Sequence, residues 1–494
     1  MTGPSPTITI EQTPQDGDGA NLTNLTTPLR SLGLEPTSAA RQIGIEARPR
    51  AIPVPIPIPW LQFAHRFLIW KQDPSVGDPG IRTSLIFGLV LNGPTDSRIT
   101  TELPGITPIA KNVLGDFIYT PLTPQFDCAH TWAVVRETLT MYERLRGQLI
   151  PWAWNTGGNT DRLTAFPDAG VTANAYYSRT AKALKFFHFT PTGATTPVHT
   201  CRSLDIVSHE TGHAVLDALK PGWLSSAGPP QTGGLHESFG DLSAIFLALS
   251  QLDQVEAVVV QSRANLHNRN FIAALAEQFG AALGFPVGLR NADNDLKLSQ
   301  VGNEVHAISQ VFTGGMYDVL ADIYAFKLAH QGGSQDPASI LLEVARHLAK
   351  LLIDAIVAAP ATAATFADVV NHMLTISANQ GDPPIYRTFI RNRFTLREVV
   401  VSPTPVAAMM EGRVDYSDEG FVDGDDVLTM ESTNIGATID AGQDRSTCCG
   451  TMQLPEFIAP DAKVLATGAS LSDDELLAKD IAELRAASKG SGKS

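Results

Sequence analysis

Hydrophobic residues recur every three or four positions over long stretches of this chain, as they do on the buried face of a helix. In the segment 128–148 the apolar residues at this spacing are Trp132, Val135, Leu139, Tyr142 and Leu145. The same periodicity dominates after residue 204. There it predicts further helices at 204–219, 235–251, 270–283, 304–330, 337–358 and 364–379.

Between residues 60 and 203 the apolar runs are shorter, for example 67–70 and 84–91, and clusters of Gly, Pro and Asp separate them. This pattern is typical of strands joined by turns. Before residue 60 the chain is rich in Thr, Pro and Gly without periodicity. Alternate prolines from Pro53 to Pro59 favour an extended connector there, because they cannot donate to a sheet.

We therefore expect an α+β fold organised in four parts. Its predicted parts are a flexible Pro-rich tail (1–59), a β-rich N-terminal lobe with one long helix (60–203), a helical C-terminal lobe (204–400) and an acidic C-terminal extension (401–494). In the extension, Ser472 and Glu475 form a capping-box pattern ahead of an amphipathic helix.

Composition narrows the class of protein. The chain has 494 residues, of which 43% are hydrophobic and 18% charged, so it can bury a large core. A net charge of −15 argues against nucleic-acid binding, and no apolar run reaches the length of a membrane helix, so neither partner is expected. Four cysteines are too few for a disulfide scaffold. The first residues lack the basic and apolar regions of a secretory signal, so we expect a cytoplasmic or non-classically exported protein.

The segment LDIVSHETGH contains the pattern H-E-x-x-H. His209 and His213 are four residues apart, so on a helix both imidazoles share a face and can bind one ion. Glu210 then lies beside that ion, where it can deprotonate a bound water. The plainer alternative is a pair of partly buried helix histidines held by ordinary hydrogen bonds.

Zinc catalysis needs a third protein ligand and an open position for water. Glu237 follows in the segment ESFGD, on what the pattern indicates is a second helix, and Asp241 lies four residues later on the same face. One carboxylate is then placed to bind the metal and the other to accept the free N–H of a ligand histidine. Alternatively, both are acidic residues near a helix N-terminus, where the helix dipole favours them.

HETGH followed by GGLHESFGDLSAIF resembles the thermolysin-type gluzincin metallopeptidases, whose pattern is HExxH and a later helix of the form GxxNExxSD. The resemblance implies a two-lobed zincin fold with a zinc ion bound by His209, His213 and Glu237. It further implies that Glu210 is the general base and that Asp241 orients His209.

Other segments extend this resemblance. The segment ANAYY is similar to the family's edge strand, which makes Asn174, Ala175 and Tyr176 candidate residues for binding an extended peptide by β-augmentation. The segment EVHAIS resembles the one with the second active-site histidine, so His306 is expected to donate to the oxyanion of the reaction. Arg290, in GLRNAD, is a candidate for the arginine that binds a substrate carbonyl. An ordinary strand and a structural histidine at a helix start are the alternatives.

The sequence also departs from the family pattern. His236 stands where an Asn usually precedes the ligand Glu, and no tyrosine lies between the second and third zinc ligands to assist the oxyanion. Val301 occupies the place of the acidic residue that normally partners the active-site histidine. The oxyanion site of this chain is therefore expected to be built differently.

Signals for calcium are incomplete. Asp205 matches one calcium ligand of the family, but Ala248 stands where another acidic ligand is expected. Residues 415–426 partly fit a calcium loop and fit a solvated acidic loop better. Cys448 and Cys449, which could in principle block a zinc ion, are expected to be a reduced pair in a loop.

The sequence thus predicts a zinc metalloendopeptidase that hydrolyses internal bonds of a peptide or protein substrate. A gluzincin aminopeptidase would need an acidic anchor for the free amine, and no G-A-M-E-N-like block is present. A catalytically weak or inactive zinc-binding scaffold on the same fold would not require Glu210. A zymogen held by 1–60 or 401–494 is a further alternative.

Overall fold

The computed structural model describes residues 64–77, 79–85, 90–224 and 229–400. Contacts divide the chain into Met1–Ile58 and Pro59–Ser494, and all described residues belong to the second unit. The predicted tail, the acidic loop 415–426, Cys448, Cys449 and the terminal amphipathic helix lie outside the described residues.

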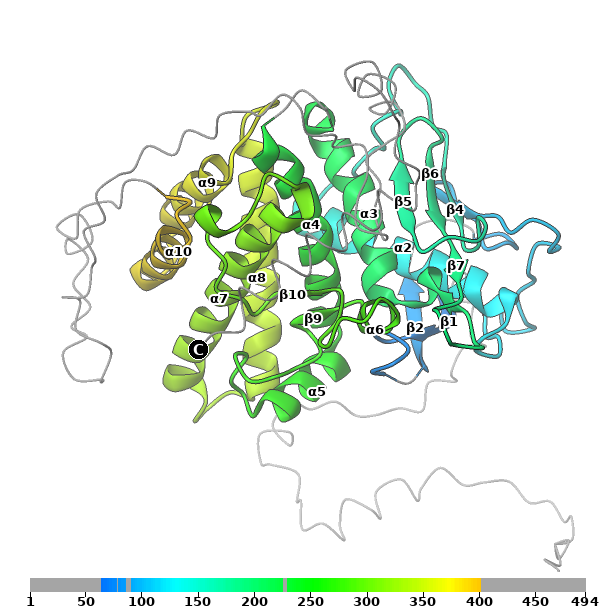
Figure 1. Ribbon diagram of the computed structural model, residues 1–494, viewed down its shortest axis with the longest axis horizontal. Helices are drawn as coiled ribbons and strands as arrows, with labels where there is room; N and C mark the ends of the chain where they lie inside the picture. The colour runs from blue at the N-terminus through cyan, green and yellow to red at the C-terminus, as the bar shows by residue number, and fades with distance from the viewer. Residues whose placement is uncertain (1–63, 78, 86–89, 225–228, 401–494) are drawn as a thin grey trace, which may run out of the picture. The chain divides into compact units, whose positions relative to one another are not determined.

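The described chain is a mixed α+β protein with long helices and small sheets (Figure 1). The strands are β1 (Ala64–Trp70), β2 (Pro79–Leu85), β3 (Ile99–Thr101), β4 (Leu163–Phe166), β5 (Ala175–Ser178), β6 (Ala183–Phe186), β7 (His188–Phe189), β8 (Val198–His199), β9 (Ala274–Leu275) and β10 (Arg290–Asn291). The helices are α2 (Pro124–Arg146), α3 (Leu204–Leu219), α4 (Pro230–Leu249), α5 (Leu252–Ser262), α6 (Glu277–Ala282), α7 (Val305–Gln331), α8 (Pro337–Ala358), α9 (Phe366–Asn379) and α10 (Pro384–Leu396).

The largest sheet among the described residues has four strands in the order β3-β4-β6-β5, which leaves β5 at one edge. β5 pairs with β6 in antiparallel register, with Tyr176 opposite Lys185. Shortly afterwards, β7 and β8 pair antiparallel with His188 opposite His199, and this hairpin leads into α3. Helix α3 packs against α4, α2 and β5, so it lies between the edge strand and the helices that follow (Figure 1).

Capping explains where the helices begin. α2 starts before the predicted residue 128, because the Thr123 side chain accepts a hydrogen bond from Phe126 N and Pro124 suits the first helical turn. It ends at Gly147, whose φ of 67° lies in the left-handed region that glycine adopts readily. α4 likewise begins at a proline, Pro230, rather than at 235. The helices α5 and α10 are not among those predicted from the apolar periodicity.

The predicted helix 270–283 is wrong over its first half, where β9 lies and only 277–282 is helical. The Asn270 side chain accepts hydrogen bonds from the backbone amides of Ile272 and Ala273, an Asx turn that competes with a helix start. Ala276 then has a left-handed φ of 51°. The apolar periodicity of this stretch therefore reflects burial in a strand and a turn before the short α6.

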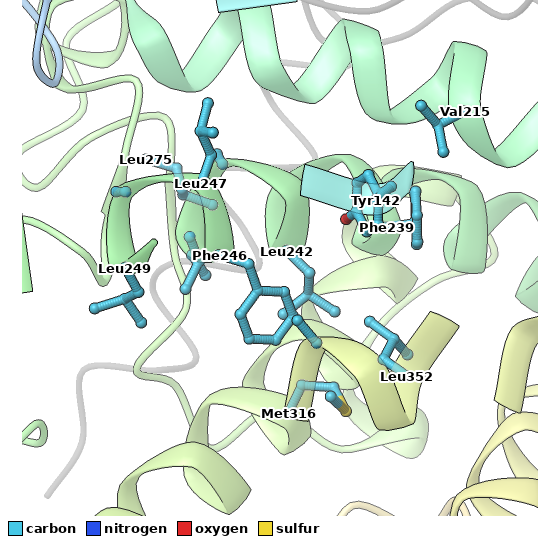
Figure 2. Packing of buried hydrophobic residues seen from close by; sticks show 14 of the residues in the cluster. Tyr142, Val215, Phe239, Leu242, Phe246, Leu247, Leu249, Leu275, Met316 and Leu352 are labelled. Atoms are coloured by element: carbon cyan, nitrogen blue, oxygen red, sulfur yellow. The ribbon is translucent and has the colours of Figure 1, made fainter. Parts of the chain in front are cut away.

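Helix α4 is the centre of the hydrophobic core and is buried on nearly all sides, which its apolar sequence allows. Phe239 stacks on Tyr142 of α2 with ring centroids 4.9 Å apart. Further along α4, Phe246 and Leu242 face Met316 of α7 and Leu352 of α8 (Figure 2). This packing fixes the position of one helix that carries predicted site residues.

Among the described helices, none is by itself long and apolar enough to span a membrane. The consecutive helices α4 and α5 meet the length and composition test only as a pair, and a bend of 97° separates them.

Candidate metal centre

Two glycines allow α3 and α4 to approach closely. A Cβ atom on Gly212 would lie 2.5 Å from Ser243 Oγ, and a Cβ atom on Gly240 would lie 2.5 Å from His209 Cε1. A side chain at either position would force the neighbouring side chain or helix to shift, so glycine suits both positions. The imidazole of His209 can therefore rest directly against the backbone of α4, next to the residues of the segment ESFGD.

The structure brings the three predicted ligands together in the interior. The Nε2 atoms of His209 and His213 are 3.0 Å apart, and each lies 3.5 Å from an oxygen of Glu237. One donor atom from each residue lies within 4.8 Å of the others, and all three residues are buried. Donor atoms around a tetrahedral zinc ion with bonds of about 2.0–2.1 Å are about 3.4 Å apart. The group therefore has the dimensions of a metal site.

The outward-facing nitrogens of both histidines have partners. His209 Nδ1 lies 3.0 Å from Asp241 Oδ1, the carboxylate predicted to orient it. His213 Nδ1 lies 3.0 Å from Nδ1 of His236, so the residue in the place of the family's Asn contacts the second ligand histidine. The sequence signal for this role was the position of His236 directly before Glu237.

Arg290 lies beside the same carboxylate. Its Nε donates to both oxygens of Asp241 at 3.1 and 3.0 Å, and its Nη2 donates to Oδ1 at 2.6 Å. The guanidinium Nη2 is also 3.4 Å from His209 Nδ1. The structure thus places Arg290 at the centre through Asp241, and its predicted contact with a substrate carbonyl stays a prediction.

Burial and charge set the protonation of the ligands. Burial lowers the pKa of His209, although Asp241 opposes the shift, and it lowers the pKa of His213 well below the usual value. Burial alone would raise the pKa of Glu237, but His306, His213 and His209 outweigh it and hold that pKa well below its usual value. Neutral imidazoles and an ionised carboxylate are the forms that bind a metal.

Glu210 is fully buried next to these ligands, at 0% exposure. Neither of its carboxylate oxygens accepts a hydrogen bond from a side chain in the part of the chain that the structure describes. Burial and the negative charge of Glu237 raise the pKa of Glu210 well above its usual value, while Arg290 and the Tyr177 backbone act in the opposite direction. A carboxyl group without side-chain donors can exchange a proton with a reacting molecule.

His306 lies in the first turn of α7 and reaches the candidate centre, where its Nε2 lies 3.2 Å from Glu237 Oε2. Its Nδ1 bonds to the carboxylate of Glu304. Glu304 also caps α7, because it accepts from the backbone amides of His306 at 3.0 Å and Ala307 at 2.7 Å. Glu304 is therefore the carboxylate partner of His306, a role that the valine at position 301 cannot fill. The sequence interpretation missed this residue.

The candidate peptide-binding residues lie on the edge strand and just before it. Ala175 N donates to the side chain of Asn174 at 2.8 Å, so one of the amides expected to face a peptide already has a partner within the chain. The ring of Tyr176 stacks on Phe187 with centroids 5.7 Å apart. The next residue, Tyr177, donates its hydroxyl to Asp217 of α3 at 2.7 Å, which fastens the edge strand to the helix of His209.

Asp205, which matches one calcium ligand of the family, lies in a group of carboxyl residues with the buried Asp73 and the partly buried Glu277. It accepts hydrogen bonds from Gln72 at 2.9 Å and from the backbone amide of Ala276 at 3.1 Å. Burial, together with Asp73, raises the pKa of Asp205 to about 8. Ala248 is a buried core residue. Calcium binding here stays a prediction.

No protein-family model matches this chain, and no curated protein matches it. Among solved structures, it is similar to the precursor of protealysin, a metalloproteinase from Serratia proteamaculans, with a TM-score of 0.38 and 13% sequence identity. That match covers 57% of this chain and 80% of the other. A similarity this low does not support any statement about function, which is therefore inferred from the geometry of the site.

Proposed function

We propose that this protein is a zinc-dependent metalloendopeptidase that hydrolyses internal bonds of peptide or protein substrates. The observation that carries the proposal is the buried group of two imidazoles and one carboxylate, His209, His213 and Glu237, with Glu210 beside it. A purely structural zinc site usually has four protein ligands and needs no additional carboxylate.

The donor set suits zinc, because imidazole nitrogen and carboxylate oxygen are its common ligands and three of them leave one position open. A zinc ion held there would act as a Lewis acid, lower the pKa of a nearby water and bring a positive charge that offsets the raised pKa of Glu210. Asp241 and His236 would hold the two ligand histidines in orientation, since each contacts the nitrogen that faces away from the ion.

Glu210 would take the proton from the attacking water and later pass it to the leaving amine, as a general base and then a general acid. His306 would donate from Nε2 to the oxyanion that develops on the scissile carbonyl. The bond between its Nδ1 and Glu304 fixes the orientation of the ring. In this chain, Glu304 would be the carboxylate partner of His306, the role that an acidic residue at position 301 has in the family.

An extended substrate would bind along β5 by adding a strand to the sheet. Two observations support binding of the substrate along β5. β5 is at the edge of the four-stranded sheet, and Tyr177 and Arg179 tie it to α3 through Asp217 at 2.7 Å each. A peptide bound at this edge would therefore have a fixed position relative to His209 and Glu210.

The test is hydrolysis of unfolded casein and of an N-acetylated peptide by the full-length protein, together with zinc content. We expect Glu210→Gln to keep its zinc and to lose about 10²- to 10⁴-fold in rate, the range for a general base. Glu256→Gln, on the exposed face of α5, is the matched control and should cleave like the parent.

Three outcomes would count against the proposal. A Glu210→Gln variant that cleaves like the parent would show that the mechanism is wrong. Zinc retention without hydrolysis in the parent would favour the scaffold alternative. Cleavage restricted to peptides with a free amino terminus would indicate an aminopeptidase.

A further inference from the structure

We propose that Asp168, His188 and His199 form a second metal site, distinct from the centre on α3 and α4, for a divalent transition-metal ion such as Zn²⁺, Ni²⁺ or Co²⁺. One donor atom of each residue lies within 4.8 Å of the other two. The proposal concerns metal binding alone, and it does not depend on peptide hydrolysis by the first centre.

The β7–β8 hairpin sets the two histidines side by side. His188 and His199 are directly opposite each other in the antiparallel register. Their rings stack with centroids 5.1 Å apart and planes inclined by 25°. Opposite residues of antiparallel strands have Cβ atoms about 4.5–5.5 Å apart, so two imidazoles in this arrangement can bind one ion.

The third donor is held by backbone hydrogen bonds. Asp168 precedes a short segment that runs beside β7, where His188 N donates to Gly170 O at 3.1 Å and Thr172 N donates to His188 O at 3.0 Å. Asp168 Oδ1 consequently lies 2.8 Å from His188 Nδ1. The carboxylate therefore belongs to a fixed part of the fold, as a preorganised ligand must.

Charge and exposure favour a cation at this place. The side chains of Asp168 and His188 are 30% and 29% exposed, so an ion can reach them from solvent. Arg202 is a cationic side chain that lowers the pKa of His199, and Asp127 binds its guanidinium through two hydrogen bonds of 2.8 Å. The charge of Arg202 is thus largely compensated, and the carboxylate of Asp168 leaves the site with a negative charge.

A second group of histidine and carboxylate residues among the described residues does not have this uncompensated negative charge. His267, Asp293 and Asp318 also lie within ligand distance of one another. However, Asp318 is already paired with Arg397 at 2.9 Å and lies 3.7 Å from Arg393. A cation there would have to compete with two guanidinium groups, so this group is a suitable negative control.

The position of the second site gives it a structural role. Asp168 precedes the edge strand β5, and His199 precedes α3, which carries His209. An ion bound by all three residues would join the segments that lead into these two elements. Two imidazoles and one carboxylate suit Zn²⁺, Ni²⁺ and Co²⁺ better than the oxygen-seeking Ca²⁺ or Mg²⁺.

The experiment counts Co²⁺ equivalents bound by the full-length protein after removal of metal, by visible absorption and by metal analysis after dialysis. We expect two equivalents for the parent, one for His213→Ala, one for His199→Asn and none for the double variant. His267→Asn should keep both. In the His213→Ala background, Co²⁺ should raise Tm, and His199→Asn should abolish that rise.

Asp168→Asn serves as a second variant, because it changes the ligand charge without altering its size. We expect it to weaken the second equivalent at least about tenfold, and circular dichroism checks that either variant folds. Retention of both equivalents in His199→Asn and Asp168→Asn would overturn the proposal. So would a single equivalent in the parent that His213→Ala abolishes, which would leave the two histidines and Asp168 as an ordinary ring stack and ion pair. A single equivalent that His199→Asn abolishes and His213→Ala keeps would support the second site and count against zinc binding at the first. Loss of casein hydrolysis does not enter these outcomes.

Discussion

Helix α3 contributes to two clusters of polar side chains, one around His209 and one around Asp205, which are one helical turn apart and differ in the charge of their neighbours. Around His209, the carboxylate of Glu237 is surrounded by imidazoles, which hold its pKa well below the usual value despite burial. Around Asp205, the neighbours are the carboxyl groups of Asp73 and Glu277. Burial and the charge of Asp73 raise the pKa of Asp205 to about 8, and burial with the charges of Asp205 and Asp73 raises that of Glu277 to about 10.

The difference shows that partners, rather than burial, decide what a buried carboxyl group does. Burial penalises the charged form in both groups. At the candidate metal centre the penalty is outweighed, so Glu237 is favoured as an ionised carboxylate beside two neutral imidazoles. In the carboxyl cluster it is reinforced, and Glu277 Oε2 has no hydrogen-bond partner among the described residues. That cluster must hold protons or bind a cation at neutral pH.

The largest expected effect comes from removing a compensating charge at the metal centre. Asp241→Asn keeps the size of the side chain but takes away the charge that faces His209 and Arg290. We expect zinc affinity to fall about 10- to 100-fold, as measured by competition with a chromophoric chelator. Asp253→Asn, in a surface pair with Arg82, is the matched control and should leave the affinity unchanged. Equal affinity in both variants would contradict the role of Asp241.

A smaller effect is expected from the partner of His306. Glu304→Gln keeps an oxygen for the cap of α7 but removes the charge next to His306 Nδ1. We expect kcat on casein to fall about tenfold with unchanged zinc content and little change in KM, because only the oxyanion donor is affected. Asp336→Asn removes the same charge from the cap of α8 and controls for helix stability. The same kcat in both variants would show that Glu304 is only a cap.

Local spacing was enough to predict which side chains come together at the candidate metal centre. His209 and His213 share a face because of helix geometry alone, and Glu237 and Asp241 do so on α4. By contrast, the partner of His306 could not be found by matching positions. Position 301 is a valine rather than an acidic residue. Glu304 lies beside His306 instead, because it is the N-cap of α7. The mixed α+β composition was also predictable, whereas the helix at 270–283 was not, since a side-chain turn at Asn270 overrides the apolar period.

The groups that tertiary pairing assembles were not visible in the sequence. Gln72 meets Asp205 across more than a hundred residues of chain. Asp168, His188 and His199 come together only because β7 pairs with β8 and a preceding segment runs beside β7. No periodicity links such residues, so a sequence pattern could not single them out.

The third prediction tests the carboxyl cluster. Groups with raised pKa bind more protons in the folded chain than in the unfolded chain, where the ordinary values are 4.5 for Glu277 and 3.8 for Asp205. The free energy of unfolding should therefore fall as pH rises from about 4 towards 8. Glu277→Gln removes one of these groups, so it should leave stability unchanged at pH 4 and raise it by about 1–3 kcal/mol at pH 8.

Urea unfolding at both pH values, with Glu256→Gln as the exposed control, measures this difference. Calcium distinguishes the two ways in which the cluster can be satisfied. If it holds protons, millimolar CaCl₂ leaves the pH dependence of the parent as it is. A saturable stabilisation by calcium at pH 8 that Glu277→Gln abolishes would instead mean that Asp73, Asp205 and Glu277 bind a cation. The two polar groups of α3 would then differ in the metal they select, oxygen ligands favouring calcium and imidazoles favouring zinc.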